Sequence, residues 1–228
     1  MKRFATTLFL VAGMVCAVAI PAARAQVVIV DYVGFDYEYP IVVPGTFGGV
    51  GNGYHGIGEV PVLGAPLTSD PANYQYTYEL TGLTASSLTV ASGFAVVEYS
   101  GPGTLTVYED SKATGTPFAY GIDPPNGSAP ASFTDGTPIL VGSVTNFRYI
   151  YDVAHGTGSY DSDFEVVGGT QFGSIPPDER KGWQFAGTSQ NSVTNPPGYA
   201  HQVDGQALLQ LPVPVRSASW GALKRRYR

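Results

Sequence analysis

The chain has 228 residues, with 18 acidic and 12 basic side chains and a formal net charge of −6 at pH 7. Residues 26–215 carry all 18 acidic side chains but only 4 of the basic ones. Nucleic acids and anionic membranes are bound by surfaces rich in Lys and Arg, so this body excludes both as partners. The single cysteine, Cys16, also excludes an internal disulfide, a zinc site built from cysteines and an iron–sulfur cluster.

The first 25 residues are typical of a secretory signal peptide. Lys2 and Arg3 precede an apolar stretch at 4–20, and small residues around Ala23 and Ala25 suit a cleavage site. We therefore expect a protein exported to the periplasm, the outer surface or the medium. Its expected parts are a signal peptide (1–25), a β domain (26–211) and a basic tail hinged by prolines (212–228), with no membrane-spanning helix after cleavage.

The first part of the chain alternates between strand and loop signals. Residues 26–39 combine an apolar run with spaced aromatic residues, which predicts a strand or strand pair. The segment 44–71 is rich in Gly and Pro, which predicts a surface loop with one short strand at 60–63. Within it, residues 51–56 match the glycine spacing of a dinucleotide-binding turn, but no helix can follow them, so we interpret them as loop.

Short strand signals then recur at close intervals, separated by Gly and Pro. Strands are expected at 74–79, 88–90, 94–99, 104–108, 159–167, 183–185 and 206–211. A loop is expected at 111–130, followed by a hairpin over 131–151 that turns at Asp135 and Gly136. In the hairpin, Phe147, Tyr149 and Tyr151 recur at period two and are expected to share one face.

These signals predict an all-β fold, because sustained helical periodicity is missing before residue 217. The expected architecture is an antiparallel two-sheet sandwich of jelly-roll or immunoglobulin-like type, with long loops rich in Gly and Pro and a short C-terminal tail. Without disulfides, such a domain depends on its hydrophobic core.

One stretch of the predicted β domain resembles a sequence pattern of exported bacterial proteins. Residues 133–144, FTDGTPILVGSV, are similar to the F-T-D-G-T-x-L-x-G pattern of uncharacterised β-rich exported proteins, including some of the PEP-CTERM type. This resemblance implies a secreted or surface-associated protein without an assigned activity. The chain departs from the PEP-CTERM pattern because its arginine-rich ending lacks the Pro-Glu-Pro signal and the membrane helix.

Three acidic residues alternate along one expected strand, namely Asp161, Asp163 and Glu165. Their carboxylates are expected on one face, where they repel each other unless solvent or a cation separates them. Calcium is the candidate cofactor because it takes oxygen ligands. The alternative is a solvated acidic face without a cofactor, since the stretch lacks the glycine of a calcium-binding loop.

A ligand site is expected around Trp183, Tyr199, His201 and Asp204, where aromatic rings would stack on sugars and polar groups would bind hydroxyls. The alternative is that the tyrosines serve only as good strand residues. His201 has Asp204 nearby, and His155 has Asp152 nearby, a spacing that could orient an imidazole for base catalysis. Serine-hydrolase and zinc-hydrolase motifs are lacking, and we assign no catalytic residue.

The tail resembles short Trp-Gly-x-x-Lys endings of exported bacterial proteins. Its candidate recognition residues are Trp220, Lys224, Arg225, Arg226 and Arg228. We expect a non-catalytic structural or adhesive protein of a bacterial surface, whose tail directs sorting or retention. The alternatives are a carbohydrate-binding module, with or without calcium, and a secreted hydrolase. The expected partners are cell-surface polysaccharide or the export machinery.

Overall fold

The computed structural model describes residues 24–40, 42, 46–121 and 130–212. This part of the chain holds nine β-strands and three short 3₁₀ helices at Ala131–Phe133, Phe172–Ser174 and Pro177–Glu179. The strands are β1 (Arg24–Tyr39), β2 (Gly53–Leu63), β3 (Tyr74–Ala91), β4 (Phe94–Ser100), β5 (Gly103–Ser111), β6 (Thr137–Asp152), β7 (Thr157–Gly168), β8 (Trp183–Gln190) and β9 (His201–Pro212). The expected all-β class is confirmed.

All nine strands belong to one sheet in the order β2-β1-β9-β8-β7-β6-β4-β3-β5. β4 and β5 follow one another along a single line, because both lie between β3 and β6 and pair with different halves of each. An additional antiparallel pairing between β2 and β3 joins the two ends of the sheet. The sheet therefore closes on itself.

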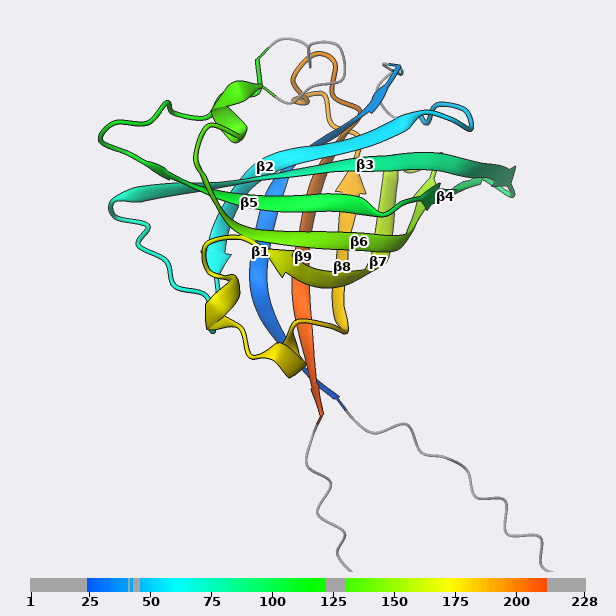
Figure 1. The fold of residues 1–228 in the computed structure, drawn as a ribbon. Helices are drawn as coiled ribbons and strands as arrows, with labels where there is room; N and C mark the ends of the chain where they lie inside the picture. The colour runs from blue at the N-terminus through cyan, green and yellow to red at the C-terminus, as the bar shows by residue number, and fades with distance from the viewer. Residues whose placement is uncertain (1–23, 41, 43–45, 122–129, 213–228) are drawn as a thin grey trace, which may run out of the picture. The chain divides into compact units, whose positions relative to one another are not determined.

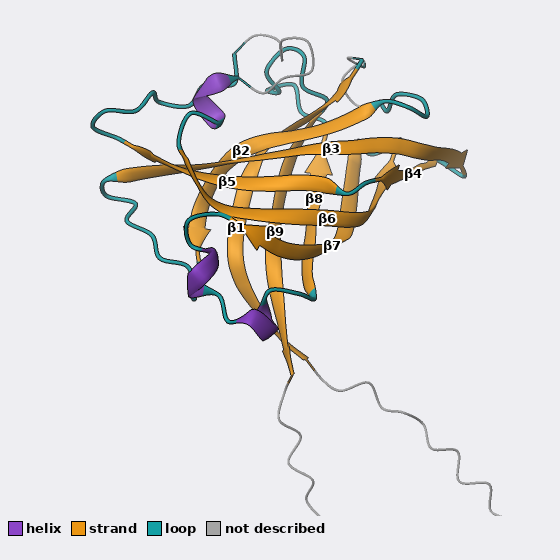
Figure 2. Ribbon diagram, in the orientation of Figure 1, coloured by secondary structure: helices purple, strands orange, loops and turns teal. Residues whose placement is uncertain are grey.

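Within the compact unit Ala25–Leu211, the closed sheet folds into two facing layers. β2, β3, β5 and β6 run across β1, β9 and β8, as Figures 1 and 2 show. This agrees with the expected two-layer, antiparallel organisation. The connectivity is simpler than that of a jelly roll or an immunoglobulin domain, because each described strand from β1 to β8, except β4, pairs with the next one along the chain.

The core lies between the two layers and is unusually aromatic. Phe147, Tyr149 and Tyr151 of β6 are at most 1% exposed, which confirms that they share the inner face. Arg148 lies between them in sequence and forms an ion pair with Glu98 on the outer face. The inner face of β3, β5 and β6 also carries aliphatic side chains, among them Leu80, Leu105 and Leu140.

A separate cluster covers the outside of β1 and β2, and we call it the outer aromatic cluster. Its members are Phe35, Tyr37, Ile57, Phe118, Tyr120, Phe133 and Tyr199. The segments before β6 and before β9 contribute to it, and the Tyr199 hydroxyl donates a hydrogen bond to the Tyr120 carbonyl at 2.6 Å. This cluster holds two long connections against the sheet.

The expected hairpin over 131–151 is correct only in its second arm. β6 is a strand, but residues 131–133 form a 3₁₀ helix rather than a partner strand. The physical reason is Phe133, which is fully buried in the outer aromatic cluster and whose carbonyl accepts a hydrogen bond from Thr77 Oγ1 at 2.8 Å. Tertiary packing here outweighs the local turn signal.

The expected long loop at 44–71 is wrong over much of its length, because β2 occupies Gly53–Leu63. Gly58 of β2 lies opposite Gly34 of β1, and a Cβ atom on Gly58 would lie 2.6 Å from the Gly34 Cα. Glycine therefore serves close approach of two strands here, instead of loop freedom. The strands expected at 74–79 and 88–90 are likewise one continuous strand, β3.

The predicted signal peptide and the tail after residue 212 lie outside the described residues. Among the described residues, no helix has the length and apolar character that crossing a membrane requires.

Candidate functional site

A buried polar network lies on the inner face where β1 meets β9. Along β1, every second residue points inward, and this alternation places Asp36 and Glu38 inside, 1% and 3% exposed. His201, the first residue of β9, is 1% exposed and lies beside Asp36. Carboxylates are rarely buried unless they are paired, so this arrangement calls for partners.

Asp36 is the centre of the network and accepts four hydrogen bonds. Its Oδ1 atom accepts one from the backbone N–H of His201 at 2.8 Å and lies 2.9 Å from His201 Nδ1. Its Oδ2 atom accepts hydrogen bonds from the hydroxyls of Tyr54 at 3.3 Å and Tyr149 at 3.2 Å. Four donors converge on one carboxylate, which compensates for the water that it loses on burial.

Glu38 is held beside this centre by its own donors. Its carboxylate accepts hydrogen bonds from the Tyr99 hydroxyl at 3.1 Å and from the backbone N–H of Gly48 at 2.9 Å. Burial raises the pKa of Glu38 above its usual value, and these two hydrogen bonds oppose that shift only in part. The side chain therefore keeps its proton to a higher pH than an exposed glutamate.

The tyrosines of the network stay protonated at neutral pH. Burial is the main cause that raises the pKa values of Tyr54, Tyr99 and Tyr149, and the nearby carboxylates add to it. Deeper in the core, the hydroxyls of Tyr32 and Tyr160 lie 2.8 Å apart and bond each other. The tyrosines thus act as hydroxyl donors to buried acceptors.

Aromatic rings enclose the imidazole of His201. Phe47 stacks on it with ring centroids 5.1 Å apart, and the Tyr151 ring lies 4.7 Å away. Among the described residues, His201 Nε2, the Tyr151 hydroxyl and the Ser189 hydroxyl are buried atoms without a hydrogen-bond partner. Asp36 orients the imidazole as in a catalytic pair, but the rings separate it from solvent.

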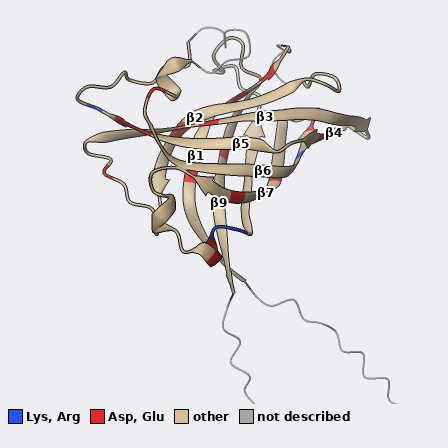
Figure 3. Ribbon diagram, in the orientation of Figure 1, with Lys and Arg blue, Asp and Glu red and all other residues tan. Residues whose placement is uncertain are grey.

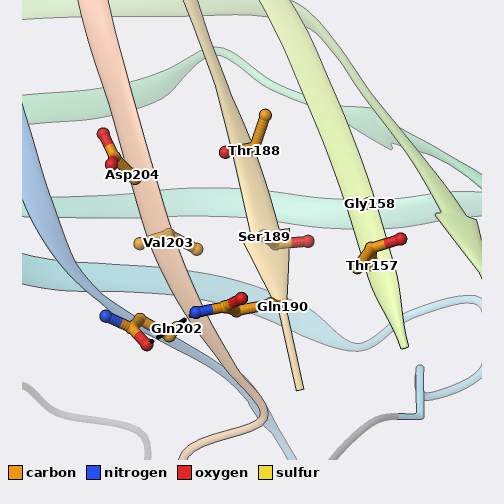
Figure 4. A pocket seen from close by; sticks show the side chains of 8 residues that line it. All are labelled: Thr157, Gly158, Thr188, Ser189, Gln190, Gln202, Val203 and Asp204. Atoms are coloured by element: carbon orange, nitrogen blue, oxygen red, sulfur yellow. Dashed lines mark hydrogen bonds between the residues drawn. The ribbon is translucent and has the colours of Figure 1, made fainter. Parts of the chain in front are cut away.

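A polar groove of about 500 Å³ lies over the adjoining ends of β7, β8 and β9, and we call it the mouth groove. Figure 4 shows its lining residues, which are Thr157, Gly158, Thr188, Ser189, Gln190, Gln202, Val203 and Asp204. The side-chain amide of Gln190 donates to Gln202 Oε1 at 3.1 Å. A second, shallower hollow continues along β8 and β9 and shares Thr188 and Asp204 with the first.

No family model matches the chain, and neither do curated proteins or solved structures. The chemistry of the mouth groove and of the buried network therefore has to carry any assignment of function.

The structure separates the four residues that the sequence grouped as a ligand site. Trp183 is buried in the core, and Tyr199 is buried in the outer aromatic cluster. His201 lies inside the closed sheet, and its partner is Asp36 rather than Asp204. Asp204 lines the mouth groove on the outer side of β9, since successive residues of a strand point to opposite faces.

The acidic row on β7 lies on the outer face, as its alternation predicts. Asp163 accepts a hydrogen bond from the side chain of Asn146 at 2.7 Å, and Glu165 forms an ion pair with Lys181 at 2.8 Å. Asp161 lies opposite Arg148 in the strand pairing. Figure 3 shows acidic positions on β7 and on other strands. Within the described ranges, no group of three or more His, Cys, Asp or Glu side chains is placed to hold a metal.

The tail residues Trp220, Lys224, Arg225, Arg226 and Arg228 lie outside the described residues. Sequence reasoning missed the network residues Asp36, Glu38, Tyr54 and Tyr99, as well as Thr157, Thr188, Gln190 and Gln202 of the mouth groove. Asp36 and Glu38 alternate with Phe35, Tyr37 and Tyr39, a pattern that by itself predicts an outward acidic face. The local sequence therefore gave no signal for the burial of these two carboxylates.

Proposed function

We propose that the protein is an exported, non-catalytic adhesion protein that binds a hydroxyl-rich polymer, such as cell-surface polysaccharide, in the mouth groove. The observation that carries this proposal is the composition of the groove. Hydroxyls come from Thr157 and Thr188, amides from Gln190 and Gln202, and one carboxylate from Asp204. Such groups pair with sugar hydroxyls, which both donate and accept hydrogen bonds.

The groove and its surroundings favour an uncharged ligand. Asp204 is its only ionisable side chain among the described lining residues, so it offers no cluster of positive charge for phosphate or nucleic acid. Trp183 and Tyr199 are buried and do not present a stacking platform for sugar rings. Recognition of the ligand therefore depends on the polar side chains of the groove. Such recognition suits a polymer that spreads several weak contacts along a groove.

The non-catalytic part of the proposal is supported by the enclosure of the ionisable network. Asp36, Glu38 and His201 are each at most 3% exposed, and the rings of Phe47, Tyr149 and Tyr151 surround the imidazole. A general base that activates a hydroxyl nucleophile forms a hydrogen bond with it, and among the described residues no hydroxyl bonds to His201 Nε2. The network is therefore assigned first to holding β1 and β9 together.

The test is binding of residues 26–228 to a panel of soluble bacterial and plant polysaccharides, measured by affinity electrophoresis and calorimetry with calcium and with chelator. For a polysaccharide that binds, Gln190→Ala is expected to weaken binding about three- to tenfold, because it removes one or two hydrogen bonds. Gln184→Ala is the matched control, since it makes the same change on the same strand outside the groove.

Two results would contradict the proposal. One is a panel in which nothing binds under either condition. The other is equal loss of binding in Gln190→Ala and Gln184→Ala, which would place the contact elsewhere on the surface.

A further inference from the structure

Three unpartnered buried polar atoms lie together at the mouth of the closed sheet. They are the Tyr151 hydroxyl, the Ser189 hydroxyl and His201 Nε2, on residues that are 1%, 5% and 1% exposed. A buried polar atom without a hydrogen bond is costly, and each one in a native protein asks for an explanation. We call these three residues the inner mouth patch.

The strand pairing places the members of the patch side by side. Tyr151 of β6 is paired with Gly158 of β7, Gly158 with Ser189 of β8, and Ser189 with Val203 of β9. His201 precedes Val203 by two residues and so lies diagonally from Ser189 on the same inner face. All four strands begin or end within two residues of this row.

The same row borders the mouth groove. Gly158, Ser189 and Val203 line the groove, although they belong to the inward-facing set of their strands. At Gly158, a Cβ atom would lie 2.8 Å from both the Ile150 carbonyl oxygen and Ser189 Oγ, and 2.9 Å from a ring atom of Tyr149. Glycine therefore allows the β6 backbone, Ser189 and Tyr149 to approach β7 closely at this point of the row.

The chemistry of the patch selects an uncharged hydroxyl. When His201 Nδ1 donates its proton to Asp36, Nε2 is left as a hydrogen-bond acceptor. The hydroxyls of Tyr151 and Ser189 can each donate or accept. A group that donates to Nε2 and accepts from Tyr151 or Ser189 satisfies two of the three atoms, and an alcohol does both.

We propose that the inner mouth patch is a subsite that takes one hydroxyl of a saccharide lying in the mouth groove. This inference rests on the proposed function and deepens it, because it names the residues that the ligand reaches beyond the groove. Phe47 covers the patch, stacked on His201 and edge-on to Tyr151. Phe47 is itself only partly buried, so the ligand hydroxyl reaches the patch from the side of this ring.

The experiment compares two tyrosine variants that each remove an unpartnered hydroxyl. Tyr151→Phe changes the patch, whereas Tyr78→Phe makes the same change on β3, outside the lining of the groove. Tyr151→Phe is expected to weaken binding of the polysaccharide found for the groove about three- to tenfold. Its Tm without ligand should stay equal or rise, because a buried hydroxyl without a partner is lost. Tyr78→Phe should leave binding unchanged.

A second readout follows His201 directly. In ¹⁵N-labelled protein, the Nε2 resonance of His201 is recorded by long-range imidazole NMR during titration with methyl α-glucopyranoside, methyl α-galactopyranoside and methyl α-mannopyranoside. The Nε2 resonance of His201 is expected to shift with at least one of them. The exposed His155 serves as the internal reference and should not shift.

The outcomes separate the subsite from the proposed function. If a polysaccharide binds and Gln190→Ala weakens it, but Tyr151→Phe binds like the wild type and has a lower Tm, the patch holds a structural water only and the subsite is overturned. If every polysaccharide fails to bind but a methyl glycoside shifts His201 Nε2, the adhesion function fails and the subsite stands. Absence of any shift at saturation overturns the subsite.

Discussion

Two sets of carboxylates lie on opposite faces of the same sheet and differ in their burial and in their hydrogen-bond partners. Inside, Asp36 and Glu38 are at most 3% exposed, and protein donors occupy their oxygen atoms. Outside, Glu165 has one protein partner, Lys181, and remains 44% exposed. Water completes the coordination of the outer set, whereas the inner set depends on the fold. The same residue type therefore contributes to stability on one face and to solubility on the other.

Among the substitutions that test this comparison, Asp36→Asn is expected to have the largest effect on stability. An amide oxygen can accept from one pair of donors, but the amide nitrogen then faces the other pair, either His201 or Tyr54 and Tyr149. We expect the free energy of unfolding to fall by about 3–5 kcal/mol, as when one partner of a buried pair is removed. Urea denaturation monitored by tyrosine and tryptophan fluorescence measures it.

The matched control for Asp36→Asn is Asp163→Asn. It makes the same chemical change on the outer face, where the carboxylate accepts a hydrogen bond from Asn146. Its expected effect on the free energy of unfolding is within about 0.5 kcal/mol. Equal losses in the two variants would show that the inner network has no special part in stability.

This contrast also explains what the sequence could and could not reveal. The alternation of Asp161, Asp163 and Glu165 is local, and the period of two was enough to place them on one face. The same rule placed Phe147, Tyr149 and Tyr151 inside. Such local patterns also gave the all-β class and most strands from residue 74 onward.

The inner network could not be predicted because its partners are far apart in the chain. Asp36 and His201 are 165 positions apart, and Asp36 and Tyr149 are 113 apart. These residues meet because β1 pairs with β9, the first and the last described strand, and because the two layers of the sheet face each other. The glycines of β2 concealed that strand, since glycine is equally typical of loops. The short spacing between His201 and Asp204 was misleading, because residues an odd number of positions apart on a strand point to opposite faces.

The pH dependence of stability sharpens the comparison at Glu38. Its native pKa is raised from the ordinary value of 4.5, so just above this pH the native state binds more protons than the unfolded state. The contribution of Glu38 is therefore fully present below pH 4.5 and is lost as pH rises through the raised native value. Glu38→Gln does not titrate, and the stability of the wild type relative to this variant should fall over that interval.

Urea unfolding curves measured in steps from pH 4 to pH 7 test the effect at Glu38. Leu140→Ala is the control, because it truncates a fully buried apolar side chain on the inner face and adds no titrating group. It should lower the free energy of unfolding by about 2–5 kcal/mol at every pH, which leaves the shape of the profile unchanged. A relative stability of Glu38→Gln that is independent of pH would contradict the burial argument.

The smallest expected effect concerns Arg148, which forms the outer ion pair with Glu98. Their side chains are 3.0 Å apart, and both are 47% exposed, so water and salt screen the interaction. We expect Arg148→Gln to lower the free energy of unfolding by about 0.2–1 kcal/mol at low ionic strength. At about 1 M salt the difference should nearly vanish, since the screening length falls to about 3 Å. The double variant Arg148→Gln with Glu98→Gln completes a mutant cycle, which gives the interaction free energy between the two side chains. An interaction free energy above about 2 kcal/mol would mean that this face is less accessible to solvent than the exposed fractions indicate.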